Sequence, residues 1–332
     1  MIEVKDLTIG YKLSKGRVKE IHRNLSFAIK DGEMTALLGA NGAGKSTLIK
    51  SLSGFIPTIS GQVIINGRDV ALLSRTELSR EVGVVLTARP ADGGLTVFDL
   101  VSFGRYPYTN YFGSFTPYDI EIIENAMESV GVSHLRDAYV SRISDGERQK
   151  AMIAKVLAQE CRTIILDEPT AFLDVKSRLE TYSLLHQIAH DKNKSVLLST
   201  HDLETTLRHA DSLVMLSKYN PLVIGTTEEL VLDGSVARLF EGEKKSPVWF
   251  NDRDGSFRID FDAKPTVFID SEDEVIGFWV ENFLIKHKFL IAKSESKAAH
   301  KVEVISSNNM IADGVKCCSF SELLGVMTKA NS

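Results

Sequence analysis

The sequence predicts an α/β protein with a mixed-sheet core, an antiparallel β subdomain, a helical subdomain and a small C-terminal α+β domain. Three observations support this prediction. Short apolar runs alternate with helical patterns in the middle of the chain, as in parallel sheets covered by helices. The first seventy residues instead alternate apolar and polar side chains with period two. The composition then changes after about Gly242, so we expect domains at residues 1–243 and 245–332.

The N-terminal segment is expected to form antiparallel strands. Residues 2–9 and 24–29 carry the period-two pattern, and Asn66-Gly67 is a tight hairpin turn signal. Within this region, residues 34–54 predict an apolar strand, a glycine-rich turn and a helix that stops at Gly54.

The pattern becomes helical from residue 95 to about residue 159, the expected helical subdomain. Thr96 and Asp99 have the spacing of a capping box, and residues 116–119, Thr-Pro-Tyr-Asp, mark a second helix start. An apolar run from Val82 to Thr87 precedes this region and predicts a buried strand that ends at Thr87.

Strands return at residues 163–167, 195–199 and 213–216, separated by a helix near 175–190. The C-terminal segment then predicts strands at 256–262, 266–270, 289–293 and 301–306, and helices at 273–287 and 319–329. This segment contains no chemical motif. It is either a separate accessory domain or an extension packed on the first domain.

Composition limits the function. The 332 residues include 39 Lys and Arg against 44 Asp and Glu, a formal net charge of −5, which argues against broad capture of nucleic acid or anionic lipid. Three cysteines are too few for a disulfide framework and indicate reduced thiols in a cytosolic protein. We expect no secretory signal, because the N-terminus lacks a basic stretch and an apolar core. We expect no membrane span, because no apolar run reaches about 18–20 residues.

Residues 39–46, Gly-Ala-Asn-Gly-Ala-Gly-Lys-Ser, match the phosphate-binding pattern G-x-x-x-x-G-K-[ST] between a predicted strand and a predicted helix. The glycines let successive backbone N–H groups point at phosphate oxygens, and the helix N-terminus adds its positive end. Lys45 is expected to reach the β- and γ-phosphates, and the Ser46 hydroxyl to coordinate Mg²⁺. The motif predicts nucleotide binding without specifying the nucleotide.

A pair of adjacent carboxylates, Asp167 and Glu168, follows the apolar run at residues 163–167. Consecutive side chains on a strand point to opposite sides, so the two groups can have different roles. We expect Asp167 to hold the Mg²⁺ shell and Glu168 to orient or deprotonate the attacking water.

Residues 143–149, Ile-Ser-Asp-Gly-Glu-Arg-Gln, lead into a helix upstream of these carboxylates. Ser144 and Gly146 can present a hydroxyl and backbone N–H groups to an anion. Together with the other motifs, this segment resembles the signature of ATP-binding cassette (ABC) proteins, whose usual form is L-S-G-G-Q. The sequence departs from that form at Ile143, Asp145 and Glu147.

The resemblance covers roughly residues 1–240 and implies a P-loop NTPase of ABC type. It implies that Asp174 is the aspartate of the D-loop and that His201 senses the γ-phosphate. Tyr11 matches the aromatic that stacks on adenine, although an ordinary tyrosine on a strand surface is the alternative. The residues expected to bind ATP are Tyr11, Gly39, Asn41, Gly42, Ala43, Gly44, Lys45, Ser46, Thr47, Ser144, Gly146 and Asp174, and the catalytic ones are Lys45, Glu168 and His201.

The resemblance also implies partners. Such cassettes form head-to-tail dimers with two ATP molecules between them, each phosphate loop facing the signature of the other subunit. A single cassette in this chain therefore predicts a homodimer that drives a polytopic membrane permease from the cytoplasmic face of the membrane. A substrate-binding protein takes part indirectly, and no nucleic acid is expected.

The phrase at residues 101–109, Val-Ser-Phe-Gly-Arg-Tyr-Pro-Tyr-Thr, resembles ATPase subunits of importers for iron–siderophore complexes, haem and cobalamin. Eight aromatic residues lie between 95 and 119 and form either a contact surface or the core of the helical subdomain. The alternatives are an exporter ATPase, a non-transport ABC ATPase acting on DNA or the ribosome, and a weakly hydrolysing regulatory subunit.

Thr87 stands where the family normally has a glutamine whose amide contacts Mg²⁺ or the attacking water. Threonine is shorter, so its hydroxyl is expected to reach the metal only through an intervening water. The sequence therefore predicts a weakened metal contact at Thr87 and a lowered ATPase activity in the absence of a partner.

Overall fold

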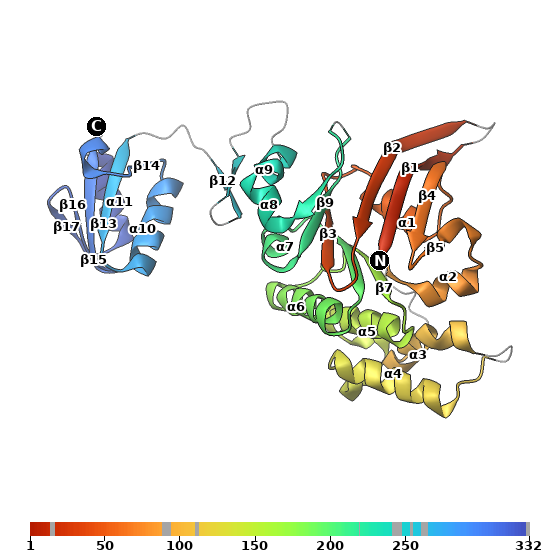
Figure 1. The fold of residues 1–332 in the computed structure, drawn as a ribbon. Coiled ribbons are helices and arrows are strands. Elements are labelled where there is room, and N and C mark those ends of the chain that lie inside the picture. Colours follow the sequence, from red (N-terminus) through yellow and green to blue (C-terminus); the bar gives the residue numbers. More distant parts are fainter. Residues whose placement is uncertain are drawn as a thin grey trace. The chain divides into compact units, whose positions relative to one another are not determined.

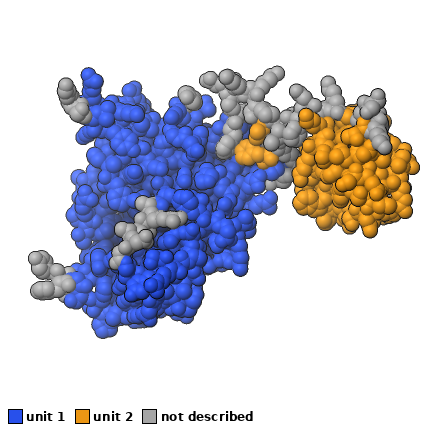
Figure 2. Space-filling model, turned by 180° about the vertical axis from the view of Figure 1, so that it is seen from behind, with its two compact units in different colours: residues 1–244, 250–256 blue, residues 245–249, 257–332 orange. Residues whose placement is uncertain are grey.

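The structure, a computed structural model, describes residues 1–13, 17–87, 94–109, 113–218, 220–240, 248–252, 255–259 and 265–329. Two compact units make up the chain, and Figure 2 distinguishes them by colour. The large unit comprises Met1–Lys244 with Phe250–Ser256, and the small unit comprises Lys245–Trp249 with Phe257–Ser332. The boundary expected from the sequence, between residues 243 and 245, lies outside the described residues.

The large unit begins with an antiparallel sheet in the order β2-β1-β4-β5 (Figure 1). Its strands are β1 (Ile2–Lys12), β2 (Val18–Ile29), β4 (Ser60–Ile65) and β5 (Arg68–Asp69). The turn between β4 and β5 is formed by Asn66 and Gly67, with φ values of 50° and 80°, in the left-handed region that Asn-Gly favours. The antiparallel arrangement and the hairpin turn confirm the prediction from the period-two pattern.

A second sheet has the order β10-β9-β3-β8-β7-β6. Its strands are β3 (Met34–Leu38), β6 (Val82–Val85), β7 (Thr163–Asp167), β8 (Ser195–Ser199), β9 (Ser212–Met215) and β10 (Val223–Thr226). All neighbours are parallel except β10, which runs antiparallel to β9. The mixed sheet is thus confirmed.

The strand predicted to end at Thr87 ends earlier, so that boundary is wrong. The last backbone pair of β6 joins Val85 to Leu166, and Thr87 uses its side chain instead to contact the end of β7. The strand predicted at 213–216 is shifted by one residue and forms β9.

Helices cover this sheet and fill the space between the two sheets. Those of the core are α1 (Lys45–Leu52), α2 (Arg75–Glu81), α6 (Val175–Asp191), α7 (Leu203–His209), α8 (Thr227–Leu232) and α9 (Ser235–Phe240), with a 3₁₀ turn η2 at Val70–Leu72. Leu48 and Ile49 of α1 share one hydrophobic cluster with Ile9 of β1 and Ile165 of β7. Burial of these apolar side chains holds α1 between the sheets, and this positions the loop that precedes α1.

The helical part of the large unit comprises α3 (Val97–Ser102), η3 (Phe103–Tyr108), α4 (Pro117–Ser129), η4 (Ser133–Leu135), η5 (Val140–Arg142) and α5 (Asp145–Ala158). Helices α3 and α4 pack on α5, which in turn contacts β6 (Figure 1). Capping boxes at Thr96–Asp99 and Thr116–Asp119 begin α3 and α4, as predicted.

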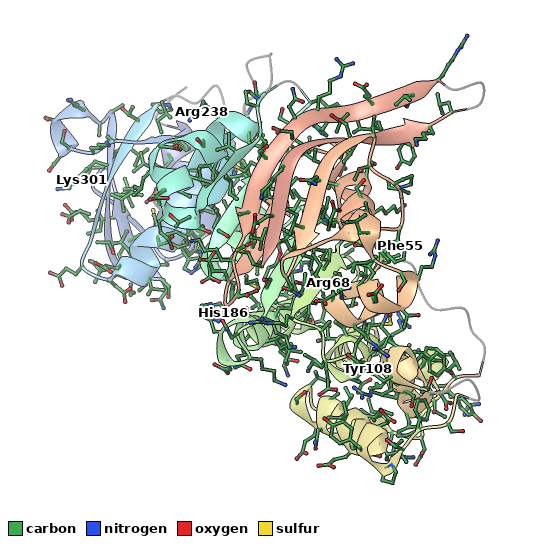
Figure 3. The ribbon with its side chains drawn as sticks, turned by 45° about the vertical axis from the view of Figure 1, so that its right-hand side comes forward. Phe55, Arg68, Tyr108, His186, Arg238 and Lys301 are labelled. Atoms are coloured by element: carbon green, nitrogen blue, oxygen red, sulfur yellow. The ribbon has the colours of Figure 1, made fainter. Side chains whose placement is uncertain are left out.

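The aromatic residues of this part differ in exposure. The half-buried Tyr108 (Figure 3) donates a hydrogen bond of 3.0 Å to the Gln159 carbonyl oxygen. Tyr106 and Tyr118 are exposed. Tyr106 lies 5.2 Å from Phe103 between ring centroids. The contact of Tyr108 agrees with packing inside the helical part, whereas a contact surface stays a prediction, and Tyr111 and Phe112 lie outside the described residues.

The small unit has a mixed sheet in the order β14-β13-β15-β16-β17 and helices α10 and α11. Its elements are β13 (Thr266–Ser271), α10 (Glu274–Lys286), β14 (Leu290–Ile291), η6 (Glu295–Lys297), β15 (His300–Ser306), β16 (Asn309–Ala312), β17 (Val315–Cys317) and α11 (Phe320–Lys329). Strands β11 (Val248–Asn251) and β12 (Ser256–Ile259) pair with each other. A hydrophobic cluster of its own, including Val267, Leu284 and Leu323, fills the small unit.

The sequence analysis missed β16 and β17, although a signal was present. Asp313 and Gly314 have φ values of 48° and 83° and form the turn between them, and Asp-Gly is a hairpin signal. The strand expected at 289–293 forms only the short β14. Within the described part of the chain, the helices lack the length and apolar character needed to cross a membrane.

Candidate nucleotide-binding site

The predicted phosphate loop and carboxylates come together at one edge of the parallel sheet. Strands β3, β7 and β8 run parallel, so their carboxyl ends, at Leu38, Asp167 and Ser199, lie along the same edge. Loops at this edge are where open α/β sheets bind ligands. The sheet therefore assembles groups that are more than a hundred residues apart in the sequence.

Glycine is required at two places in the loop. Gly44 is the N-cap of α1 and has a φ of 100°, a conformation that is strained for any residue with a Cβ. At Gly39 a Cβ would lie 2.4 Å from the carbonyl oxygen of Leu216, so a side chain cannot fit. The loop can therefore turn sharply from β3 into α1 and leave the first N–H groups of the helix facing outward. Asn41, within this turn, is exposed.

Lys45 is buried at the mouth of this loop, with only 6% of its surface exposed. Its Nζ donates a hydrogen bond of 2.8 Å to the carbonyl oxygen of Gly39. Burial lowers the pKa of Lys45, while the carboxylates of Glu168 and Asp167 act in the opposite direction. A buried ammonium group beside a glycine-rich loop is suited to bind a phosphate chain.

Asp167 lies at the end of β7 with its side chain enclosed. Its Oδ1 accepts hydrogen bonds from the Ser199 hydroxyl at 2.6 Å and from the Ser46 hydroxyl at 3.4 Å. A carboxylate and a hydroxyl at this separation are the hard oxygen donors that Mg²⁺ prefers. The residues present therefore fit a magnesium site.

Glu168 follows with a backbone conformation that is rare for a residue with a side chain, at φ 50°. Its N–H donates to the carbonyl oxygen of Ser199 at 3.2 Å and to the Ser199 hydroxyl at 3.0 Å, which holds this conformation in place. The carboxylate Oε2 of Glu168 lies 3.8 Å from Nδ1 of His201, which is exposed after β8. The structure thus brings the predicted base and the predicted sensor together.

Two side chains of the antiparallel sheet contact α1 and the loop that precedes it. The Tyr11 hydroxyl is 3.0 Å from Oγ1 of Thr47 in α1, and 40% of the Tyr11 surface is exposed. His22, which sequence analysis missed, places its Nε2 2.6 Å from the carbonyl oxygen of Ala43. A single histidine within a strand gives no signal of such a contact in the sequence.

A small pocket of about 50 Å³ lies beside the carboxylates and is lined by Thr87, Asp167 and Glu168 together with residues of α5. Gln149 of α5 is one of them, and its amide Nε2 is buried without a hydrogen-bond partner among the described residues. Sequence analysis missed Gln149, since α5 reaches this pocket only through the tertiary fold.

Three further predicted site residues lie at helix starts, namely Ser144 and Gly146 at α5 and Asp174 at α6. Ser144 is the N-cap of α5 in a capping box with Glu147, and its hydroxyl bonds to the Glu147 carboxylate lower the pKa of that group. Asp174 is the N-cap of α6 and accepts from the Ser177 N–H at 3.0 Å. A Cβ on Gly146 would lie 2.8 Å from Oγ of Ser177, so glycine lets these two helix starts approach closely.

The loop after β3 and the carboxylates after β7 define a P-loop nucleotide-binding protein. The profile of the ABC transporter family matches residues 22–171. The chain is 37% identical over 241 residues to an uncharacterised ABC transporter ATP-binding protein of Methanocaldococcus jannaschii, covering 73% of this chain and 81% of that one. It therefore belongs to the ABC ATPase family and binds and hydrolyses ATP.

Two further comparisons agree. The ferric enterobactin transport ATP-binding protein of Escherichia coli is 35% identical over 236 residues, 71% of this chain and 85% of that protein. The solved structure of CbiO1 from Clostridium perfringens, part of an ABC transporter complex, has 28% identity and a TM-score of 0.61, and covers 71% of this chain and 92% of that one.

Proposed function

We propose that this chain is the ATP-hydrolysing subunit of an importer and powers uptake of a ferric siderophore through a separate membrane permease. The proposal rests on the similarity to the ferric enterobactin transport protein and on the grouping of Lys45, Glu168 and His201 around the phosphate loop. Haem or a cobalamin-type solute is the alternative cargo, and export is the alternative direction.

In this proposal Lys45 binds the β- and γ-phosphates, and the loop from Gly39 to Thr47 supplies backbone N–H groups to them. The buried position of Lys45 supports this role, since a charge removed from water attracts an anion more strongly. Tyr11 stacks on adenine, which the exposure of Tyr11 beside α1 allows. Ser46 and Asp167 would hold Mg²⁺, which would neutralise phosphate charge.

Glu168 is proposed to orient the attacking water and to accept its proton. Its contact with His201 supports this role, because a histidine next to the carboxylate can bind the γ-phosphate while the carboxylate acts on the water. The two carboxylates have different neighbours, since Glu168 lies beside His201 and Asp167 accepts from Ser46, so one can serve the water and the other the metal.

Gln149 is proposed to supply the amide that Thr87 lacks. A buried donor without a partner costs free energy unless it acquires one in another state of the site. The pocket next to Glu168 is where such a partner would lie, and Gln149 then positions the water with Glu168.

The active assembly is proposed to be a head-to-tail homodimer at the cytoplasmic face of the membrane. Ser144, Gly146 and Asp174 would then contact the ATP bound by the partner subunit. The location of Ser144 and Gly146 at the start of α5 supports this, because the positive end of a helix attracts phosphate. A substrate-binding protein would deliver the cargo to the permease, without contacting this chain.

Co-purification tests the transport proposal. The chain, expressed with its genomic neighbours, is expected to co-purify with a polytopic membrane protein, and reconstitution with that protein is expected to raise ATP turnover. A weakly hydrolysing regulatory role would be favoured if turnover stayed at the same low rate with the membrane partner bound. Recovery of the chain with ribosomes or DNA would favour a non-transport ATPase.

A further inference from the structure

We propose that His186, His190 and Asp211 form a binding site for a divalent transition-metal ion of the Zn²⁺ type. One ligand atom of each residue lies within 4.8 Å of those of the other two. The imidazole rings of His186 and His190 stack with a centroid distance of 4.1 Å and an interplanar angle of 24°. His190 Nε2 is 3.0 Å and 3.1 Å from the two carboxylate oxygens of Asp211.

The positions of the two histidines favour a shared ligand. They are four residues apart on α6, so both side chains project from the same face of that helix. Two imidazoles and a carboxylate form the donor set of tetrahedral zinc sites with a fourth position for water, and they suit Zn²⁺ better than Mg²⁺ or Ca²⁺. An ion pair of His190 with Asp211 would require only one of the two histidines.

Asp211 is held in place by the backbone. Its Oδ2 accepts a hydrogen bond of 2.7 Å from the N–H of Met34, and its own N–H donates to the Met34 carbonyl oxygen at 2.9 Å. Its carbonyl oxygen accepts from the N–H of Thr227 at 3.3 Å. Such outer contacts orient a ligating carboxylate before the metal binds.

The site is separate from the nucleotide site. Asp211 precedes β9 and Met34 begins β3, and these parallel strands start at the edge opposite to the one that carries the phosphate loop. A bound ion would join the last turns of α6 to the starts of β3 and β9. Metal binding is therefore expected to stabilise the large unit without filling the ATP site.

Titration of the untagged, reduced full-length chain with Zn²⁺ tests the proposal. Calorimetry is expected to show one site per chain that is lost, or weakened at least about tenfold, in His186→Gln and in His190→Gln. The same two substitutions are expected to remove the rise in melting temperature that Zn²⁺ produces. Circular dichroism checks that both variants fold, and both histidines are partly exposed.

Two control variants separate this site from other zinc ligands. His287→Gln removes an exposed histidine at the C-terminal end of α10, and Cys318→Ser removes an exposed thiol. Both are expected to bind Zn²⁺ as the unmodified chain does. The proposal is overturned if the chain shows no saturable binding, if both histidine variants bind unchanged, or if only Cys318→Ser loses the site.

Discussion

The hydroxyl of Thr87 donates a hydrogen bond of 2.7 Å to the main-chain carbonyl oxygen of Asp167. This bond joins the segment after β6 to the end of β7, where the predicted metal ligand and base follow each other. Thr87, which lies where the chain enters the helical part, is therefore connected to Asp167 and Glu168, the carboxylates predicted to act in hydrolysis. Its hydrogen is engaged by the backbone, and Thr87 and Glu168 line the same pocket.

Thr87→Gln is expected to raise ATP turnover of the isolated chain. The glutamine amide is two heavy atoms longer and can reach the metal or the water directly, whereas the threonine hydroxyl stops short. Steady-state phosphate release measures the effect. Thr87→Val is the matched control, because it keeps the shape, removes the hydrogen bond at a cost of about 1 kcal/mol and should not raise turnover. An unchanged rate in Thr87→Gln would count against the weakened contact.

Gln149→Met is expected to separate stability from catalysis. Removing an amide whose buried Nε2 has no hydrogen-bond partner among the described residues should leave the free energy of unfolding unchanged or raise it by about 1 kcal/mol. The kcat for ATP should fall at least about tenfold with little change in KM, because the amide would act on the water rather than on the bound nucleotide. Gln187→Met, on the exposed face of α6, is the control. Equal kcat values in the two variants would contradict the role of Gln149.

Arg105→Met is expected to lower the free energy of unfolding by about 3–5 kcal/mol, since it leaves buried acceptors unpaired. The Arg105 side chain is 3% exposed, and its Nε donates to Oδ1 of Asp119 at 2.9 Å. Denaturant unfolding measures the loss. Arg136→Met removes an arginine that is 41% exposed and paired with Glu124, and should cost no more than about 1 kcal/mol. Similar losses in both variants would show that the Arg105 pair does not anchor the helical part.

The phosphate loop and the strands that flank it could be predicted from the sequence because each depends on local signals. The G-x-x-x-x-G-K-S pattern, the capping boxes at Thr96 and Thr116 and the apolar run of β7 involve neighbouring residues only. The contacts of Gln149 and His22 could not be predicted in this way. They depend on α5 and β2 being carried to the site by the packing of the whole unit, which no local pattern encodes.

The resemblance of residues 101–109 to importer subunits pointed to a functional role, and the structure adds a physical reason for part of that phrase. Gly104 leaves no space for a side chain, because a Cβ there would lie 2.2 Å from the Lys155 carbonyl oxygen. Arg105 and Tyr108 then reach the end of α5 through hydrogen bonds. Short phrases of this kind combine packing and function, which sequence alone does not separate.

A chain that ends near residue 243 is expected to keep its basal ATP turnover. The small unit buries its own hydrophobic cluster, which includes Val267, Val302 and Met327, so the large unit should fold without it, although it loses its Phe250–Ser256 segment. Phosphate release by the shortened and full-length chains, at equal concentrations, measures this. An insoluble or inactive shortened chain would favour a packed extension over a separate accessory domain.

In the proposed site, ATP is hydrolysed at Glu168 and bound through Lys45. The most direct measurement is ATP binding and turnover in Glu168→Gln beside Lys45→Ala and the unmodified chain. We expect Glu168→Gln to bind ATP with unchanged affinity, to lose turnover at least about a hundredfold and to accumulate as a dimer with ATP, whereas Lys45→Ala loses affinity. Turnover by Glu168→Gln at the rate of the unmodified chain would contradict the account.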